Sequence, residues 1–221
     1  AKIPDLVTSG LPHVAVRIPN HPLTLQLLDQ LDFPLAAPSA NPFGYVSPTT
    51  AQHVNDQLGE KIPFILDGGA CQVGLESTIV GLVDGVITVF RLGGLSLESI
   101  EDVVGKVQVR SHSSNPQAPG MLDSHYSPRK KVLLGNIPEL IQNHRDQSPI
   151  LIRFSSLLSD YPEALQLVLS PQASVSEAAI NLFKYLRLAD QFETSLILAE
   201  LVPEIGLGRA INDRLKRAAF H

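Results

Sequence analysis

Short apolar runs alternate along this chain with segments in which the apolar positions recur at helical spacing. In the first half, apolar runs predict strands at 14–18, 35–38 and 63–67, and leucines three and four residues apart predict a helix at 23–31. In the second half, three strands are each followed by a helix; the strands are predicted at 132–134, 150–154 and 196–198 and the helices at 138–144, 175–191 and 208–219. Such strand–helix pairs favour a small parallel, Rossmann-like α/β domain.

Turn and cap residues define further elements near the middle of the chain. The segments 76–83 and 86–91 flank Asp84-Gly85, which predicts a hairpin because a type I′ turn needs positive φ at both of its central positions. Ser96 and Gly105 bound a helix at 97–104. The residues that follow are rich in Ser, Pro, Asn and Gly, so a linker is expected. The predicted division is therefore a first domain at 1–106, a linker at 107–130 and a second domain at 131–221.

One polar loop concentrates candidate chemistry. The predicted strand at 35–38 leads into a turn that carries Ser39, Asn41 and Ser47. Ser47-Pro48 has the pattern of an N-cap and first helical residue, which predicts a helix from there to Leu58 that ends at Gly59. A helix start of this kind can bind phosphate, although a plain polar connection has the same pattern.

Two arginines add to this interpretation. Arg17 and Arg91 each follow an apolar strand and precede a turn. Strand-end arginines are usually solvated. Their guanidinium groups nevertheless pair well with carboxylates and phosphates, which favours an anion site near the hydroxyl groups of Ser39, Ser47 and Ser77.

Composition excludes several function classes. The 221 residues carry a net charge of −5, which argues against broad binding to nucleic acid. The single cysteine, Cys71, rules out an internal disulfide and fits a reducing compartment. The sequence shows no membrane-spanning run, signal peptide, zinc-ligand spacing, Gly-x-Ser-x-Gly elbow, P-loop or dinucleotide fingerprint.

The ordered motifs carry a resemblance that covers nearly the whole chain. The sequence resembles the YrdC-like threonylcarbamoyl-AMP synthase family in its long, two-domain form, through Arg17-x-Pro-x-His21, Ala37-Pro-Ser-Ala-Asn41, Ser47-Pro-Thr49, Asp67-Gly-Gly69, Gly74-x-Glu-Ser-Thr78, Arg91-x-Gly93, Ala118-Pro-Gly-Met121, His125-Tyr-Ser-Pro128, Pro203-Glu-x-Gly-Leu-Gly208 and Ala210-Ile-x-Asp-Arg-Leu215. The fold implied by this resemblance is a YrdC-like twisted mixed sheet with helices, followed by the Rossmann-like domain.

The resemblance also implies an activity. The family forms L-threonylcarbamoyladenylate and pyrophosphate from L-threonine, bicarbonate and ATP with Mg²⁺, for threonylcarbamoyladenosine in tRNA, in the cytoplasm and alongside other tRNA-modification proteins. It implies that Arg17, Ala37 and Ser77 bind L-threonine, and that ATP is bound by His13, Ser39, Asn41, Ser47, Arg91 and Tyr126. No side-chain nucleophile, protein metal ligand or membrane partner is implied.

One departure from the family pattern sets a further expectation. The family's N-terminal Lys-x-Arg pair, which grips the phosphates, has no counterpart here, since Lys2 lacks such a partner. We therefore expect the chain to lack an N-terminal segment and to be inactive as a synthase alone. The alternatives to a synthase are a carbamoyltransferase-related enzyme and a non-catalytic RNA-binding or regulatory module.

The Pro119-Gly120 pivot before His125 and Tyr126 predicts that the linker is a lid.

Overall fold

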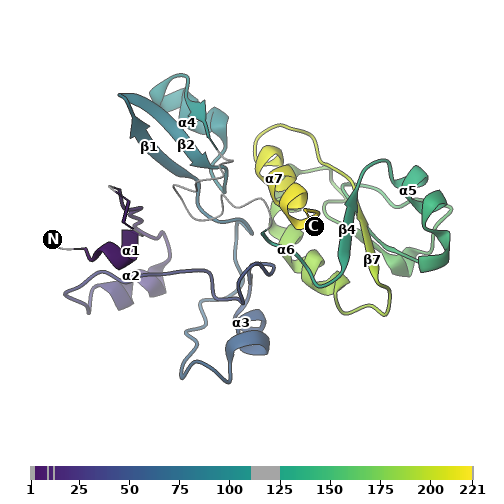
Figure 1. Ribbon diagram of the computed structural model, residues 1–221, viewed down its shortest axis with the longest axis horizontal. Coiled ribbons are helices and arrows are strands. Elements are labelled where there is room, and N and C mark those ends of the chain that lie inside the picture. The colour runs from purple at the N-terminus through teal and green to yellow at the C-terminus, as the bar shows by residue number, and fades with distance from the viewer. Residues whose placement is uncertain (1–2, 9, 12, 111–124, 221) are drawn as a thin grey trace.

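The computed structural model describes residues 3–8, 10–11, 13–110 and 125–220 (Figure 1). In the second half, four strands form a parallel sheet in the order β4-β7-β5-β6. Their bounds are Lys131–Leu134 (β4), Ile150–Arg153 (β5), Gln166–Val168 (β6) and Leu196–Ala199 (β7). The predicted parallel sheet is confirmed, and β6 is an addition that the apolar pattern did not reveal.

Helices cover both faces of this sheet. They are α5 (Ile137–Asn143), α6 (Val175–Ala189) and α7 (Gly208–Ala218), with short 3-10 turns at Arg145–Gln147 (η1) and Glu163–Leu165 (η2). Side chains alternate across a strand, so Ile150 and Ile152 pack with α6 and α7, whereas Leu151 packs with α5 on the opposite face. Figure 1 shows α6 and α7 on the side of the sheet that is nearer to the first half of the chain.

The first half contains a smaller, mixed sheet. Strands β1 (Ile79–Val83) and β2 (Val86–Arg91) form an antiparallel hairpin, and β3 (Gln108–Val109) runs parallel to β2. Asp84 and Gly85 have φ angles of 50° and 78°, which confirms the predicted hairpin turn. Helix α4 (Leu97–Val104) is also confirmed, with the Ser96 side chain accepting a hydrogen bond from Ser99 N and Gly105 at a φ of 76°.

Three predicted strands in the first half are wrong. Residues 14–18, 35–38 and 63–67 are not paired as strands, and Val16, Ile18 and Phe64 have 81%, 86% and 88% of their surface exposed. An apolar run becomes a strand only when a neighbouring strand accepts its backbone hydrogen bonds. The remaining helices here are α1 (Asp5–Thr8), α2 (Pro22–Leu28) and α3 (Ala51–Leu58).

The start and end of α3 differ from the prediction. The N-cap is Thr50, whose hydroxyl accepts a hydrogen bond from His53 N, and Ser47 lies in the loop before it. The Ser47 hydroxyl instead donates to the carboxylate of Glu76, and the helix begins only at Ala51. Gly59 ends the helix in a right-handed conformation with a φ of −53°, so its freedom to adopt positive φ is not used.

Candidate functional site

The carboxylate of Glu76 lies at the centre of the predicted site residues. Its Oε1 accepts a hydrogen bond of 2.9 Å from Ser47 Oγ, which joins the polar loop at 41–47 to the Gly-x-Glu-Ser-Thr motif at 74–78. Its Oε2 accepts from two nitrogens of Arg214 on α7, at 3.0 Å from Nη2 and 3.3 Å from Nε. This carboxylate therefore connects both halves of the molecule.

Charge keeps this carboxylate ionised. Burial alone would raise the pKa of Glu76, but the positive charge of Arg214, the backbone hydrogen bond and the charge of Arg91 outweigh it and hold the pKa below its ordinary value. Burial opposes the charge of Arg214 as well, yet Glu76, Tyr126 and Asp213 raise the pKa of Arg214 above its ordinary value. Both shifts indicate an ion pair.

Arg91 ends β2 and contacts the backbone beside Glu76. Its Nε and Nη2 donate to the carbonyl oxygen of Ser77 at 3.1 and 2.9 Å, and Nη2 also donates to Ser77 Oγ at 3.3 Å. The family resemblance implies a role in ATP binding for Arg91 and in threonine binding for Ser77, and these two residues are in direct contact.

Tyr126 packs beside Arg214 and against α6. Its ring is 1% exposed, stacks on Phe183 of α6 with centroids 5.4 Å apart, and lies 5.3 Å from Arg214 Cζ. Its backbone has a φ of 63°, which is a strained conformation for a tyrosine. Next to it, Ser127 N donates to the carbonyl oxygen of Gly44 at 2.9 Å. The segment 125–128 is thus paired with the polar loop.

The polar loop is also held by α6 and by the residue that follows it. Arg187 donates to the carbonyl oxygens of Val46 and Ser47 at 2.6 and 3.1 Å. The Tyr45 hydroxyl donates to Asp190 Oδ2 at 2.7 Å. Burial, followed by this hydrogen bond to Asp190, raises the pKa of Tyr45 to about 12. The loop conformation is therefore fixed from the second half of the chain.

Several buried polar atoms around this loop have no hydrogen-bond partner within the described residues. They are Asn41 Oδ1, His125 Nδ1 and Ser127 Oγ. The amide of Asn41 does bond, through Nδ2, to the carbonyl oxygens of Pro42 and Tyr45. Burial lowers the pKa of His125, which disfavours its charged form. Unpaired buried atoms of this kind commonly mark the place of a ligand or water.

The structure brings together only part of the predicted set. Ser47, Ser77, Arg91 and Tyr126 surround Glu76 and Arg214, and Asn41 belongs to the same loop. The other predicted residues lie exposed: His13, Arg17, Ala37 and Ser39. Arg17 is close enough for its charge to act on Arg91. The predicted pivot at Pro119-Gly120 and the motif at 118–121 lie outside the described residues.

Sequence reasoning missed the residues that hold this group together. Glu76 and Arg214 belong to quoted motifs but received no role, and Arg187 was not singled out. A signal was nevertheless present, because Arg214 lies between Ile211 and Leu215, and Arg187 follows Phe183 by four residues, on the apolar faces of their helices. A charged residue on a buried helix face needs a partner.

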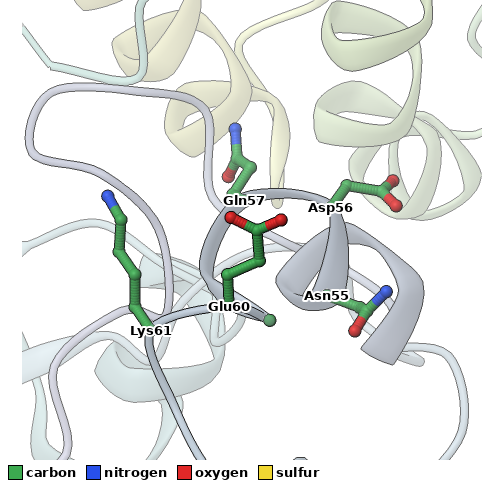
Figure 2. A pocket seen from close by; sticks show the side chains of 6 residues that line it. Asn55, Asp56, Gln57, Glu60 and Lys61 are labelled. Atoms are coloured by element: carbon green, nitrogen blue, oxygen red, sulfur yellow. The ribbon is translucent and has the colours of Figure 1, made fainter.

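A separate pocket lies at the end of α3. It has a volume of about 250 Å³ and is lined by Asn55, Asp56, Gln57, Gly59, Glu60 and Lys61 (Figure 2). Figure 2 shows Asp56, Glu60 and Lys61 around it. Gln57, whose Oε1 accepts a hydrogen bond from Arg187, links it to the polar loop, but the predicted site residues are not in its lining.

The described residues also bear on metal binding and membrane insertion. Within these residues, no three His, Cys, Asp or Glu side chains gather into a group that could hold a metal ion. The helices seen in the same ranges include none that is long and apolar enough to cross a bilayer.

The fold and site together define an α/β protein with a mixed sheet and a separate parallel sheet, whose halves meet at the ion pair between Glu76 and the buried Arg214. Residues 95–220 match the family described as the C-terminal domain of threonylcarbamoyl-AMP synthase, and residues 1–93 match a family described as telomere recombination. The chain belongs to the threonylcarbamoyl-AMP synthase family.

Named relatives support this membership. The chain is 37% identical to the threonylcarbamoyl-AMP synthase of Pyrococcus abyssi over 98% of its own length and 67% of the relative's. For the proteins of the same name from Bacillus subtilis and Schizosaccharomyces pombe, the identities are 35% and 39%, over 96% and 98% of this chain. The chain spans only 65% and 60% of those two relatives.

A solved structure agrees with the fold. The crystal structure of Sua5 from P. abyssi in complex with L-threonine superposes on this chain with a TM-score of 0.88, at 37% identity. The match covers 98% of this chain and 67% of that one. The expected α/β architecture with a mixed sheet and a second, parallel sheet is therefore confirmed.

Proposed function

We propose that the protein containing this chain is a threonylcarbamoyl-AMP synthase, a nucleotidyltransferase that forms L-threonylcarbamoyladenylate and pyrophosphate from L-threonine, bicarbonate and ATP. The observation that carries the proposal is the convergence of three distant segments, 41–47, 74–78 and 125–128, through Ser47, Glu76 and the Gly44–Ser127 contact. Relatives with this name cover nearly the whole chain. We further propose that the reaction takes place in the cytoplasm, alongside other tRNA-modification proteins.

The proposed binding roles follow the grouping of side chains. Ser77, Arg17 and the backbone of Ala37 take L-threonine, and the P. abyssi structure in complex with that amino acid supports a threonine site in the family. ATP is taken by the polar loop and the groups around it: His13, Ser39, Asn41, Ser47, Arg91 and Tyr126. The hydrogen bonds from Arg91 to Ser77 support adjacent sites for the two substrates.

The chemistry suits these residue types. The carboxylate of threonine carbamate attacks the α-phosphorus of ATP, so an O–P bond forms as the bond to pyrophosphate breaks. Negative charge then grows on phosphate oxygens, and fixed N–H groups, guanidinium and hydroxyls with a free proton stabilise it. Mg²⁺ fits here as a companion of the ATP phosphates, because both oxygens of Glu76 are already hydrogen-bonded within the described site.

Pyrophosphate release by the full-length protein tests the proposal. We expect release that requires ATP, L-threonine and bicarbonate together, and a new adenylate detected by mass spectrometry. Release or transfer driven by carbamoyl phosphate would instead indicate a carbamoyltransferase-related enzyme. RNA binding without any turnover would indicate a regulatory module, and either result would refute the synthase assignment.

A further inference from the structure

Arg214 is the largest side chain of the described residues that is completely buried. It lies on α7, on the apolar face that carries Ile211 and Leu215. A buried charge is expensive unless hydrogen-bonded partners surround it. Asp213 Oδ2 accepts from Arg214 Nη1 at 3.1 Å, and Arg217 Nε donates to the same oxygen at 3.0 Å. The Nη1 side of the Arg214 guanidinium is thus hydrogen-bonded within α7.

The other side of the Arg214 guanidinium contacts the first half of the chain. Nε and Nη2 of Arg214 both donate to Glu76 Oε2, which orients the carboxylate so that its Oε1 faces Ser47. The guanidinium carbon also lies 5.3 Å from the ring centroid of Tyr126, at cation–π distance. Arg214 therefore contacts two groups, Glu76 and Tyr126, that border the proposed ATP site.

The chain of hydrogen bonds fixes the direction of the Ser47 hydroxyl. An ionised carboxylate can only accept hydrogen bonds, and a serine hydroxyl has a single proton to donate. Since that proton points at Glu76, the oxygen of Ser47 offers only lone pairs to a bound molecule. A ligand atom at this position must then be a donor or a cation, not a bare phosphate oxygen.

We propose that Arg214 is a positioning residue for the ATP site, acting through Glu76 to hold the Ser47 hydroxyl as a hydrogen-bond acceptor. The second sheet domain thereby controls how the first half of the chain binds nucleotide. This inference rests on the proposed synthase function. A merely structural Arg214 would affect folding, whereas a positioning Arg214 affects ATP binding through Ser47.

A double-mutant cycle in the full-length protein separates these two roles. Arg214→Lys keeps the charge but loses the fork, and Ser47→Ala removes the hydroxyl. We expect each single variant to raise KM for ATP by about tenfold or more, which is the range for a lost charge-assisted hydrogen bond. We expect the double variant to be within about twofold of the worse single one, with KM for threonine little changed.

The matched control is Arg209→Lys, on the same helix. Arg209 also forms an ion pair with the first half of the chain, but its partner is Glu98 on α4. We expect this variant to leave KM for ATP unchanged. Because Arg214→Lys can fail to fold, Glu76→Gln supplies a second route. Its amide can donate to Ser47 and reverse the hydroxyl, so KM for ATP should rise in the presence of Ser47 and not in Ser47→Ala.

The outcomes are distinct. Unchanged KM in Arg214→Lys, or effects of Arg214→Lys and Ser47→Ala that multiply in the double variant, would overturn the positioning role while the synthase function stands. If Arg214→Lys does not fold, an equal effect of Glu76→Gln with and without Ser47 would overturn it in the same way. A wild-type protein without ATP- and threonine-dependent pyrophosphate release would overturn the proposed function and this inference with it.

Discussion

Arg91 joins two proposed binding roles through one side chain. Its guanidinium donates to the carbonyl oxygen and hydroxyl of Ser77, and the charge of Arg17 reaches it. A planar fork of donors can hold a backbone oxygen and still face an anion, which a lysine cannot do with the same geometry. The binding of ATP and of threonine is therefore expected to depend on the same residue.

Replacing Arg91 should weaken the binding of both ATP and threonine. In Arg91→Ala, we expect ATP affinity to fall by about 1.5–3 kcal/mol, the range for a hydrogen bond to a charged group, with a smaller loss for threonine through Ser77. Calorimetric titration of each substrate measures this. Arg110→Ala, which removes an exposed arginine just after β3, is the control. ATP affinity equal to that of the wild type would remove Arg91 from the site.

Glu76 should make stability depend on acidity. Its pKa in the folded protein lies below the ordinary value of 4.5, so its contribution is fully present above that pH. The contribution is lost as the pH falls through the lowered pKa of the folded state. We expect Glu76→Gln to flatten the decline in urea-unfolding midpoint between about pH 5 and 3. Glu163→Gln, at an exposed position, should leave the decline as it is.

At the scale of elements, α6 begins with an indirect capping box. Ser174 Oγ accepts from Glu177 N, but Ser174 N donates to Ser170 Oγ and not to the Glu177 carboxylate. Ser170 lies between them, since its hydroxyl accepts from Ser174 N and donates to Glu177 Oε2. The cap therefore anchors the loop after β6 as well as the helix.

Removing this cap should destabilise the second sheet domain. We expect Ser174→Ala to lower the free energy of unfolding by about 0.5–2 kcal/mol, as for other N-caps. Chemical denaturation followed by circular dichroism measures the loss. Ser156→Ala, at an exposed loop position, is the control. A loss equal to that of the control would mean that Ser170 caps the helix sufficiently by itself.

The accuracy of the sequence predictions differs between the halves for a physical reason. The strands β5 and β7 are buried on both faces and the apolar residues of β4 are buried or half-buried, so each appears as a continuous apolar run beside its helix. The turn at Asp84-Gly85 is equally local. By contrast, the run at 14–18 has a strand pattern without a paired neighbour, and composition alone does not reveal which partner a strand has.

The site was predictable only in part for the same reason. Motifs indicated Ser47, Ser77, Arg91 and Tyr126, and the structure gathers them. The ion pair that holds them joins residues 138 positions apart, and no spacing rule connects Glu76 with Arg214 over that distance. Only the burial pattern of α7, with a charged residue on its apolar face, could have suggested such a partner.

At the scale of the whole molecule, the first half exposes many apolar side chains. Val16, Ile18 and Phe64 are more than four-fifths exposed, and His21 Nε2 lies 3.1 Å from the carbonyl oxygen of Gly68, so the two apolar segments approach each other at their ends. We expect this surface to bind a hydrophobic dye. The double variant Val16→Ser and Phe64→Ser should reduce the fluorescence.

The control for the dye experiment is Val103→Ser on α4, which is 83% exposed and lies outside the two apolar segments. If those segments form the dye-binding surface, this replacement should hardly change the signal. Equal effects of the two replacements would show that the apolar segments do not act as one surface. If an added polypeptide lowers the dye signal, that polypeptide covers the two apolar segments.

Charge leads to a second expectation at this scale. ATP brings about four negative charges, and sites for it gather several cations. The proposed ATP set has one arginine, Arg91, and the chain spans 60–67% of the named relatives considered above. We expect residues 1–221 alone to release little pyrophosphate, because one arginine faces this charge. Full turnover by residues 1–221 alone would contradict this.

The ion pair between Glu76 and Arg214 also has a consequence for protein synthesis. The ribosome adds about 5–20 residues per second, so Arg214 follows Glu76 by roughly 7–28 s. During that interval the nascent chain has the polar loop but lacks the guanidinium that orients it. A message cut short before the codon for Arg214 would therefore yield a chain with most of the site residues and no assembled site, and partial products should not compete for ATP in the cell.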